Sequence, residues 1–163
     1  MSDGDTAEIG LARTGETEAV GRLLRESGLP DAEVDELGDT LLVARSGDRI
    51  VGSAALELYP PAALLRSVAV DPALRGSGLG VELTEAALAL ARELGLERLF
   101  LLTETAAAFF PRFGFRVVAR EEVDPAVKRS REFTALCPES AQAMVLELGH
   151  GRDPDPGTAK KAP

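Results

Sequence analysis

The sequence predicts an α/β domain, and three observations lead to this class. The 163 residues correspond to about one domain on the usual range of domain lengths. Apolar residues make up 45% and charged residues 28% of the chain, which is typical of a globular protein. Strand-length apolar runs also alternate with segments of helical period. We therefore expect one domain over residues 1–148 and a disordered tail, rich in Gly, Pro, Asp and Lys, over residues 149–163.

The first half of the chain is predicted to contain a helix followed by a strand meander. Apolar residues recur at helical spacing over residues 17–27, and Gly28 and Pro30 end this pattern. Ser46-Gly47-Asp48 predicts a hairpin turn, and Pro60-Pro61 predicts a second reversal of the chain. In order, we expect a strand at 8–12, a helix at 17–27, a helical turn at 34–37, and strands at 40–45, 49–59 and 62–70.

The second half begins with the strand expected at the centre of the sheet. Residues 62–70 read AALLRSVAV, a mostly apolar run that is typical of a strand buried on both faces. A helix with an apolar stripe, Leu83, Ala87, Leu90 and Leu94, is expected over residues 81–94, with Gly95 as its stop. The remaining elements are strands at 98–103, 115–119 and 141–148, a short helix at 106–113 and a helical turn at 126–129.

The charge of the chain argues against a polyanionic partner. With 27 acidic and 18 basic residues the net charge is -9, which is the wrong sign for neutralising a phosphate backbone. No apolar run reaches membrane-spanning length, and the first residues, MSDGDTAE, lack the positive and apolar regions of a signal peptide. We therefore expect a cytoplasmic protein that binds neither nucleic acid nor a membrane.

The cysteine and histidine content excludes several kinds of site. The single cysteine, Cys137, cannot form an internal disulfide, and the single histidine, His150, lies in the expected tail. Since the two cannot form a Cys/His cluster of recognisable spacing, no metal site is expected. Hydrolysis by Ser/His/Asp or Cys/His catalysis also has no histidine base within the fold. Cys137 is expected to be a small buried apolar residue.

The segment from Val70 to Gly80 carries the chemistry, because it joins a buried strand to a strong helix. Glycines at 76, 78 and 80 allow the backbone to curl with its amide N–H groups pointing inward. A helix that begins near Leu79 adds its positive end, and Arg75 adds a fixed charge. The segment is therefore shaped to hold a pyrophosphate, and a glycine-rich connector without a ligand is the alternative. Its glycine spacing differs from the dinucleotide-binding GxGxxG, and a Walker lysine is absent.

At these positions the sequence resembles the GNAT superfamily of acyl-CoA-dependent N-acetyltransferases. The family signature is a strand, then R/Q-x-x-G-x-G/A, then a helix, and Arg75, Gly78 and Gly80 occupy its three defining places. The resemblance extends over residues 8–148, including residues 106–115, which are similar to the family's A-x-x-x-[YF]-x-x-x-G-F pattern. It implies a mixed, mostly antiparallel sheet of six to seven strands with helices on both faces.

The resemblance also implies acetyl-CoA as co-substrate, in a V-shaped opening between the strands that end at Val70 and Thr103. It assigns the pantetheine arm to backbone groups of one strand and the pyrophosphate to the amides of the glycine-rich segment. The implied cofactor-binding residues are Val68, Ala69, Val70, Arg75, Gly76, Ser77, Gly78, Leu79, Gly80 and Thr103.

One departure from the family concerns Phe110, because many members have a tyrosine there that protonates the departing thiolate. Phenylalanine has no proton to donate, so water or another side chain serves instead, or the thiolate leaves unassisted. Unassisted departure is tolerable for a thiol with a pKa of about 8.5. We expect Phe110 among the substrate-binding residues, and a purely core role is the alternative.

Two carboxylates and one arginine are candidates for the acceptor side. If Pro60-Pro61 forms a two-residue reversal, Glu57 and Arg66 are diagonal neighbours on one face of a hairpin. A buried Arg66 needs a partner, so the two form either a structural ion pair or a functional pair. In the functional pair Arg66 holds a substrate carboxylate while Glu57 accepts a proton from the incoming ammonium. Glu104, after the next strand, is a second base candidate, with a solvated loop carboxylate as the alternative.

The resulting hypothesis is an acetyl-CoA-dependent N-acetyltransferase that acts on a small amine, by direct attack in a ternary complex. Leu64-Leu65-Arg66-Ser67, the run that begins at Thr105 and the segment Phe133-x-x-Leu-Cys-Pro-x-Ser resemble GNAT proteins of arsenic-resistance operons. This implies an amino acid or an arsenic- or phosphorus-containing analogue as acceptor. A non-catalytic acyl-CoA-binding or regulatory domain and a peptide or protein N-acetyltransferase are the alternatives. A homodimer is also open, because dimers are common in families of this shape.

Overall fold

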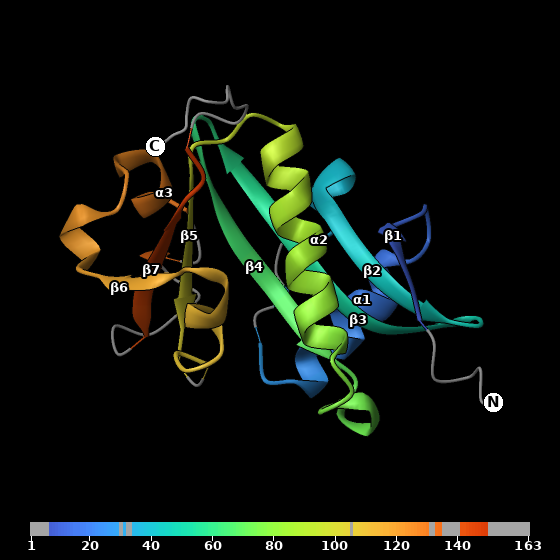
Figure 1. Ribbon diagram of the computed structural model, residues 1–163. Helices are drawn as coiled ribbons and strands as arrows, with labels where there is room; N and C mark the ends of the chain where they lie inside the picture. The colour runs from blue at the N-terminus through green and yellow to red at the C-terminus, as the bar shows by residue number, and fades with distance from the viewer. Residues whose placement is uncertain are drawn as a thin grey trace, which may run out of the picture. The chain divides into compact units, whose positions relative to one another are not determined.

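The computed structural model of the chain describes residues 7–29, 31, 34–104, 106–130, 133–134 and 141–149. Seven strands of the described residues form one sheet in the order β1-β2-β3-β4-β5-β7-β6, which places β4 at its centre as predicted (Figure 1). Cys137, His150 and the predicted tail beyond Gly149 lie outside the described residues. The strands are β1 (Glu8–Leu11), β2 (Leu41–Ser46), β3 (Arg49–Tyr59), β4 (Ala62–Val70), β5 (Arg98–Thr103), β6 (Arg116–Val118) and β7 (Gln142–Glu147).

The sheet is mixed and mostly antiparallel, which confirms the predicted fold class. Antiparallel ladders join β1 to β2, β2 to β3, β5 to β7 and β6 to β7, and a parallel ladder joins β4 to β5. The helices are α1 (Thr17–Glu26), α2 (Leu79–Glu93) and α3 (Pro125–Lys128), with 3₁₀ turns η2 (Val34–Glu36), η3 (Gly38–Thr40), η4 (Pro72–Leu74), η5 (Phe110–Phe113) and η6 (Arg120–Glu122).

The described residues form two compact units, of which the first contains those among 7–57 and 65–88. Here the apolar stripe of α1 packs with β2, β3 and β4 into one buried cluster. Successive residues of a strand point to opposite faces of the sheet, so the residues between those of this cluster face a second helix, α2. At Gly52 of β3 a Cβ atom would lie only 2.6 Å from Leu83 of α2, so the glycine allows α2 to pack closely on that face. The cluster under α1 contains Val20, Leu23, Leu24, Val34, Leu41, Val43, Ala55 and Ala69.

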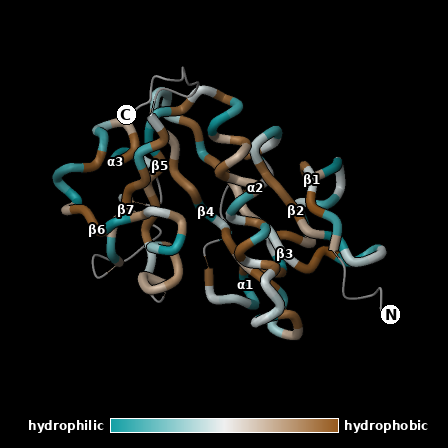
Figure 2. Tube along the Cα trace, viewed as in Figure 1, coloured by the Kyte–Doolittle hydropathy of each residue, from teal (hydrophilic) through white to brown (hydrophobic). Residues whose placement is uncertain are grey.

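The second unit contains the described residues among 58–64 and 89–149. Its core is a buried apolar cluster around Phe100 of β5, which also contains residues of β4, β6, β7 and α3. Arg98 at the start of β5 pairs with Asp124, which precedes α3, at 2.9 Å between Nη2 and Oδ2. Figure 2 shows the hydrophobic stretches along the strands that supply these cores. The cluster contains Ala62, Leu64, Phe100, Val118, Val123, Val127, Ala143 and Val145.

Two helix predictions need correction. The helix expected over residues 106–113 is only the 3₁₀ turn η5, because Pro111 has no N–H to donate to a preceding carbonyl. The helix expected from Val81 begins at Leu79, whose N–H donates to the Ser77 hydroxyl at 3.4 Å. Leu94, placed by the sequence in the buried stripe, follows the end of α2 and is exposed.

Thr40 also differs from its prediction as the first residue of a strand. It ends η3, where its hydroxyl donates to the carbonyl oxygens of Leu37 at 2.8 Å and of Leu56 at 2.5 Å. These bonds fasten the turn before β2 to the neighbouring strand β3. Leu56 is 16 residues away from Thr40, so the sequence pattern around Thr40 does not show the contact between η3 and β3.

One ion pair ties the start of α1 to β2. Arg45 donates from Nε to Glu16 Oε2 at 2.7 Å and from Nη2 to Glu16 Oε1 at 2.8 Å, and Nη2 also reaches the carbonyl of Leu11. The side chains of Arg45 and Glu16 are 10% and 19% exposed. The hydrogen bonds from Arg45, followed by the one from the Arg13 N–H, lower the pKa of Glu16 to about 2. Bidentate geometry with little exposure makes this a stabilising pair.

Glu16→Gln is therefore expected to lower the free energy of unfolding near neutral pH, by at most about 3 kcal/mol on the value of a pKa shift. Because the folded pKa lies below the ordinary 4.5, the contribution is complete above that value and is lost as the pH falls through about 2. Urea unfolding at about pH 7 and about pH 3 should show the gap between wild type and variant closing in acid. Glu18→Gln, at an exposed site on α1, is the control. A difference in free energy of unfolding between wild type and Glu16→Gln that is the same at both pH values would contradict the prediction.

Candidate active site

The glycine-rich loop after β4 starts from a fixed point, Asp71. The Asp71 N–H donates to the carbonyl of Val51 on β3 at 2.8 Å. Its carboxylate accepts the Ala73 N–H at Oδ1, at 2.9 Å, and the Arg49 guanidinium at Oδ2, at 2.8 Å. The sequence predicted only that Asp71-Pro72 ends the strand. The structure adds that Asp71 holds the loop to β3 and opens the 3₁₀ turn η4.

Two of the three glycines from which the sequence predicted a curled loop have the backbone conformation of a curl. Gly76 has φ +86° and Gly78 has φ +92°, in the left-handed region that favours glycine. No atom lies within 4 Å of where a Cβ would stand on either residue, so each glycine is required by its backbone conformation and not by crowding. Gly80 differs from the other two, since it is the second residue of α2.

The loop leaves backbone donors available at the start of a 15-residue helix. In the described part of the chain, the N–H groups of Gly76, Gly78 and Gly80 donate to no protein acceptor, whereas the Ser77 N–H donates to Leu74. Arg75 is exposed and donates from Nε to the Val70 carbonyl at 3.3 Å, which keeps its charge beside the loop. Unpaired amides, a helix N-terminus and a guanidinium together fit a phosphate or pyrophosphate group.

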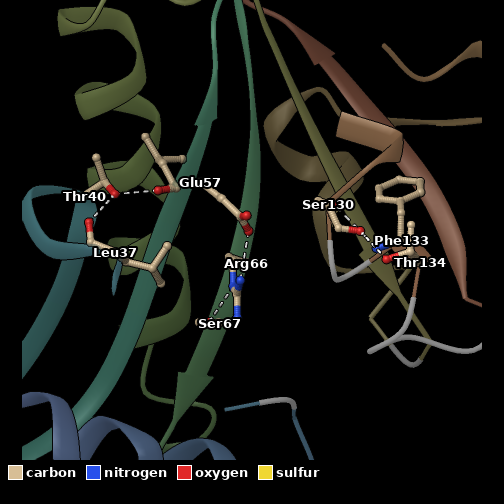
Figure 3. Close-up of polar contacts among 9 residues, drawn as sticks. Leu37, Thr40, Glu57, Arg66, Ser67, Ser130, Phe133 and Thr134 are labelled. Carbon is tan, nitrogen blue, oxygen red and sulfur yellow. Dashed lines mark hydrogen bonds and ion pairs between the residues drawn. The ribbon is translucent and has the colours of Figure 1, made fainter. Parts of the chain in front are cut away.

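Glu57 and Arg66 meet as the hairpin count predicted. Figure 3 shows their charged ends pointing toward each other, with Arg66 Nη1 at 2.9 Å from Glu57 Oε1. The Arg66 side chain has no exposed surface, whereas that of Glu57 is 21% exposed. Glu57 is therefore the member of the pair with exposed surface, and direct contact between Arg66 and a substrate carboxylate would require Arg66 to be uncovered.

Sequence reasoning missed the conformation of Ser67. Ser67 is buried in β4 with φ +59°, and among the described residues it is the one non-glycine residue with positive φ. The Ser53 hydroxyl donates to its carbonyl at 2.7 Å, and Arg66 Nε donates to its hydroxyl at 3.3 Å. Hydroxyls at 53 and 67 within apolar strands were the one available signal. The half-buried Val68 and Val70 and the buried Ala69 follow directly after this residue.

The remaining predicted site residues belong to the second unit. Thr103 ends β5, and its hydroxyl accepts the Ala106 N–H at 2.9 Å, while Glu104 follows as an exposed residue. Phe110 is buried, with edge-to-face contacts to Phe109 at 5.1 Å and to Phe115 at 5.7 Å between ring centroids. These contacts explain its burial by packing alone, as the core alternative stated.

Two features are absent from the described residues. No group of three or more His, Cys, Asp or Glu side chains is arranged to hold a metal ion. None of the helices formed by these residues combines the length and the apolar character needed to cross a membrane.

A central strand followed by a glycine-rich loop and a helix, in a mixed sheet, is the arrangement that the resemblance to acyl-CoA acyltransferases implied. The model of the acetyltransferase (GNAT) family matches residues 14–115 of the chain. The protein therefore belongs to the GNAT family, which confirms the resemblance seen in the sequence.

Curated relatives carry several names. An amino-acid acetyltransferase of Mycobacterium tuberculosis is 45% identical over 69 residues, which are 41% of this chain and 38% of that protein. A [citrate [pro-3S]-lyase] ligase of Klebsiella pneumoniae is 37% identical over 104 residues, 63% of this chain and 28% of that protein. The chain thus spans well under half the length of these relatives.

Solved structures share the fold more completely. Rv2747 of Mycobacterium tuberculosis, solved in complex with CoA, is 28% identical, with a TM-score of 0.74 over 86% of this chain and 99% of that chain. N-acetylglutamate synthase of Neisseria gonorrhoeae, complexed with coenzyme A and N-acetyl-glutamate, is 20% identical, with a TM-score of 0.76 over 88% of this chain and 35% of that chain. The second likeness shows the fold alone.

The contacts of Asp71 predict which variant disturbs the loop. Asp71→Ala removes the acceptor for the Ala73 N–H, so we expect faster hydrogen exchange at Ala73 and a loss of about 1 kcal/mol of stability. Arg49→Ala removes an ion pair whose arginine side chain is 70% exposed, and such pairs contribute under about 1 kcal/mol. Exchange measured by NMR should therefore separate the two variants at Ala73. Equal protection in both would contradict the role of the Asp71 carboxylate as a cap.

Proposed function

We propose that this protein transfers the acetyl group of acetyl-CoA to the amino group of a small acceptor. The observation that carries the proposal is the loop after β4, where the amides of Gly76, Gly78 and Gly80 are available at the start of α2. Membership of the GNAT family and a CoA complex of the 28% identical Rv2747 support acetyl-CoA as the ligand of this loop.

In this proposal the loop residues 75–80 bind the pyrophosphate through their amides and the Arg75 guanidinium. The backbone groups of residues 68–70 bind the pantetheine arm, because they continue β4 beyond the buried Ser67. Thr103 is the expected contact from β5. Acetyl-CoA supplies the activated thioester, and the chain supplies binding and orientation.

Glu57 is the base that we assign to the acceptor side. Its carboxylate is held by Arg66 and is partly exposed, so it is placed to accept a proton from an ammonium group, directly or through water. Glu104 remains the second candidate, as an exposed carboxylate directly after β5. With Arg66 fully buried, we assign the contact with the acceptor to Glu57, and Phe110 stays a predicted substrate-binding residue.

The acceptor class that we propose is an amino acid or an amino-acid analogue. Relatives named amino-acid acetyltransferases occur in three bacteria, with identities of 38–45% over the matched segments. Arsenic- and phosphorus-containing analogues, a homodimer and a cytoplasmic location stay predictions from the sequence. A second candidate function, a non-catalytic acyl-CoA-binding domain, is favoured by Phe110, which lacks the proton donor of many family members.

Release of free CoA separates these two functions. The protein is incubated with acetyl-CoA and single acceptors, namely amino acids and their phosphorus and arsenic analogues, and the thiol is detected with a colorimetric reagent. Acceptor-dependent thiol release is the expected result. Binding of CoA without release in the presence of any acceptor would favour the acyl-CoA-binding domain.

We expect CoA to raise the melting temperature of the wild type, because it binds the folded state alone. Gly78→Val should abolish this shift, since a branched side chain is strained at φ +92° and would distort the loop. Gly47→Val is the matched control: Gly47, in the turn between β2 and β3, has φ +62° and equally open surroundings. It should lose stability but keep the CoA-dependent shift. Loss of the shift in both variants would contradict a role of the loop in binding.

The choice between the two carboxylates is tested by isosteric substitution. Glu57→Gln should lower kcat about 10²-fold or more, as for loss of a general base. Glu104→Gln should change kcat less than about threefold if Glu57 is the base. The reverse pattern would move the assignment to Glu104.

A further inference from the structure

Among the described residues of the first unit, Arg66 is the one charged residue that is buried. Its guanidinium has no exposed surface and lies on a strand whose neighbouring residues, Leu64 and Leu65, are also buried. Burial of a charge is unfavourable unless the charge is paired and hydrogen-bonded. An arginine in such a place acts on groups of the protein around it, so its role has to be read from the groups that it holds.

The contacts of Arg66 join two strands at one point. Nη1 reaches Glu57 on β3 at 2.9 Å, while Nε reaches the hydroxyl of Ser67, the next residue on β4, at 3.3 Å. Figure 3 shows the guanidinium between these two groups. Glu57 therefore fixes the direction of the guanidinium, and the guanidinium in turn holds Ser67.

Ser67 needs to be held, because its backbone is in an unfavourable conformation. At φ +59° an L-residue other than glycine is strained, and the strain persists only where the surroundings determine it. Two contacts do so here, since Arg66 holds the hydroxyl and Ser53 holds the carbonyl oxygen at 2.7 Å. Ser53 is itself completely buried on β3.

The conformation of Ser67 sets the direction of the strand after it. A left-handed residue within a strand interrupts the alternation of side chains and reorients the backbone that follows. Residues 62–67 are all buried, whereas Val68 and Val70 are half-buried on either side of the buried Ala69. The segment proposed to bind pantetheine therefore begins where Ser67 changes the course of β4.

We propose that Arg66 is a positioning residue for the pantetheine-binding segment of β4. Anchored by Glu57, it acts through Ser67 on the backbone of residues 68–70 and contacts neither CoA nor the acceptor. This inference rests on the proposed function, and it concerns the pantetheine arm alone, since the pyrophosphate is assigned to the loop that starts at Asp71.

The test uses two ligands that differ by the pantetheine arm. Calorimetry measures the Kd for CoA and the Kd for adenosine 3′-phosphate 5′-diphosphate, which is CoA without that arm. Arg66→Met should raise the Kd for CoA about tenfold, the size expected when a strained residue loses its support. The Kd for the truncated ligand should change less than about twofold, because the loop is intact.

A second substitution tests the route through Ser67. Glycine adopts positive φ without strain, so Ser67→Gly added to Arg66→Met should bring the Kd for CoA back to within about threefold of wild type. Ser53→Ala removes the other support while leaving the buried charge paired, so it should raise the Kd for CoA in the same direction. This variant keeps the test decisive if Arg66→Met does not fold.

The outcomes separate this inference from the proposed function. If the wild type binds neither ligand, the proposed function fails and the inference fails with it. If the wild type binds both, and Arg66→Met and Ser53→Ala weaken both ligands equally or weaken neither, only the positioning role is overturned. Failure of Ser67→Gly to restore the Kd for CoA would likewise overturn the route through Ser67.

Discussion

The constraint on which the site depends is the change of environment along β4. Up to Ser67 the strand is buried and is built mostly from apolar residues, and the one charge within it, that of Arg66, is paired with Glu57. After Ser67 the strand becomes half-buried, and its backbone continues into the loop. A strand buried along its whole length would leave no polar groups for a ligand, whereas an exposed one would not fix the direction of the loop.

The loop is held at its start and open in its middle. Three hydrogen bonds converge on Asp71, one through its N–H and two through its carboxylate, so the chain leaves β4 in a defined direction. Beyond Ser77 the donors of Gly78 and Gly80 have no protein partner among the described residues. Amides arranged before a ligand arrives lose little entropy on binding, which favours affinity for an anion more than flexible lysines would.

The strands were predictable where the sequence marks both of their ends. Arg49–Tyr59, Ala62–Val70 and Arg98–Thr103 have the predicted bounds, because apolar runs there are flanked by turn residues such as Gly47 and Pro60-Pro61. The prediction of a helix over residues 106–113 was wrong, because Pro111 lacks the N–H group that a continuous helix needs there. Local patterns thus located the elements, and errors arose where one residue changed the hydrogen bonding.

The candidate site was predictable in proportion to how local its geometry is. Glycines at 76 and 78 predict positive φ, because glycine adopts this conformation without strain. A two-residue turn at Pro60-Pro61 predicts that Glu57 and Arg66 are neighbours across the hairpin. The left-handed conformation of Ser67 depends instead on Ser53, 14 residues away, and on the packing of both strands. Serine alone has no such preference, so the sequence offered no rule from which to derive it.

The chemistry of acetyl transfer shows why Phe110 is compatible with the proposed activity. A thiol has a pKa of about 8.5, so the thiolate of CoA is a good leaving group without a proton donor. The pKa of an α-amino group lies above neutral pH, so near neutral pH most of the acceptor is protonated and lacks the lone pair that attacks the thioester. Removal of that proton is the step that needs help from the protein. In the proposed function, the partly exposed Glu57 carboxylate would take up that proton. A phenylalanine at position 110 is compatible with this proposal, because departure of the thiolate does not require a proton donor.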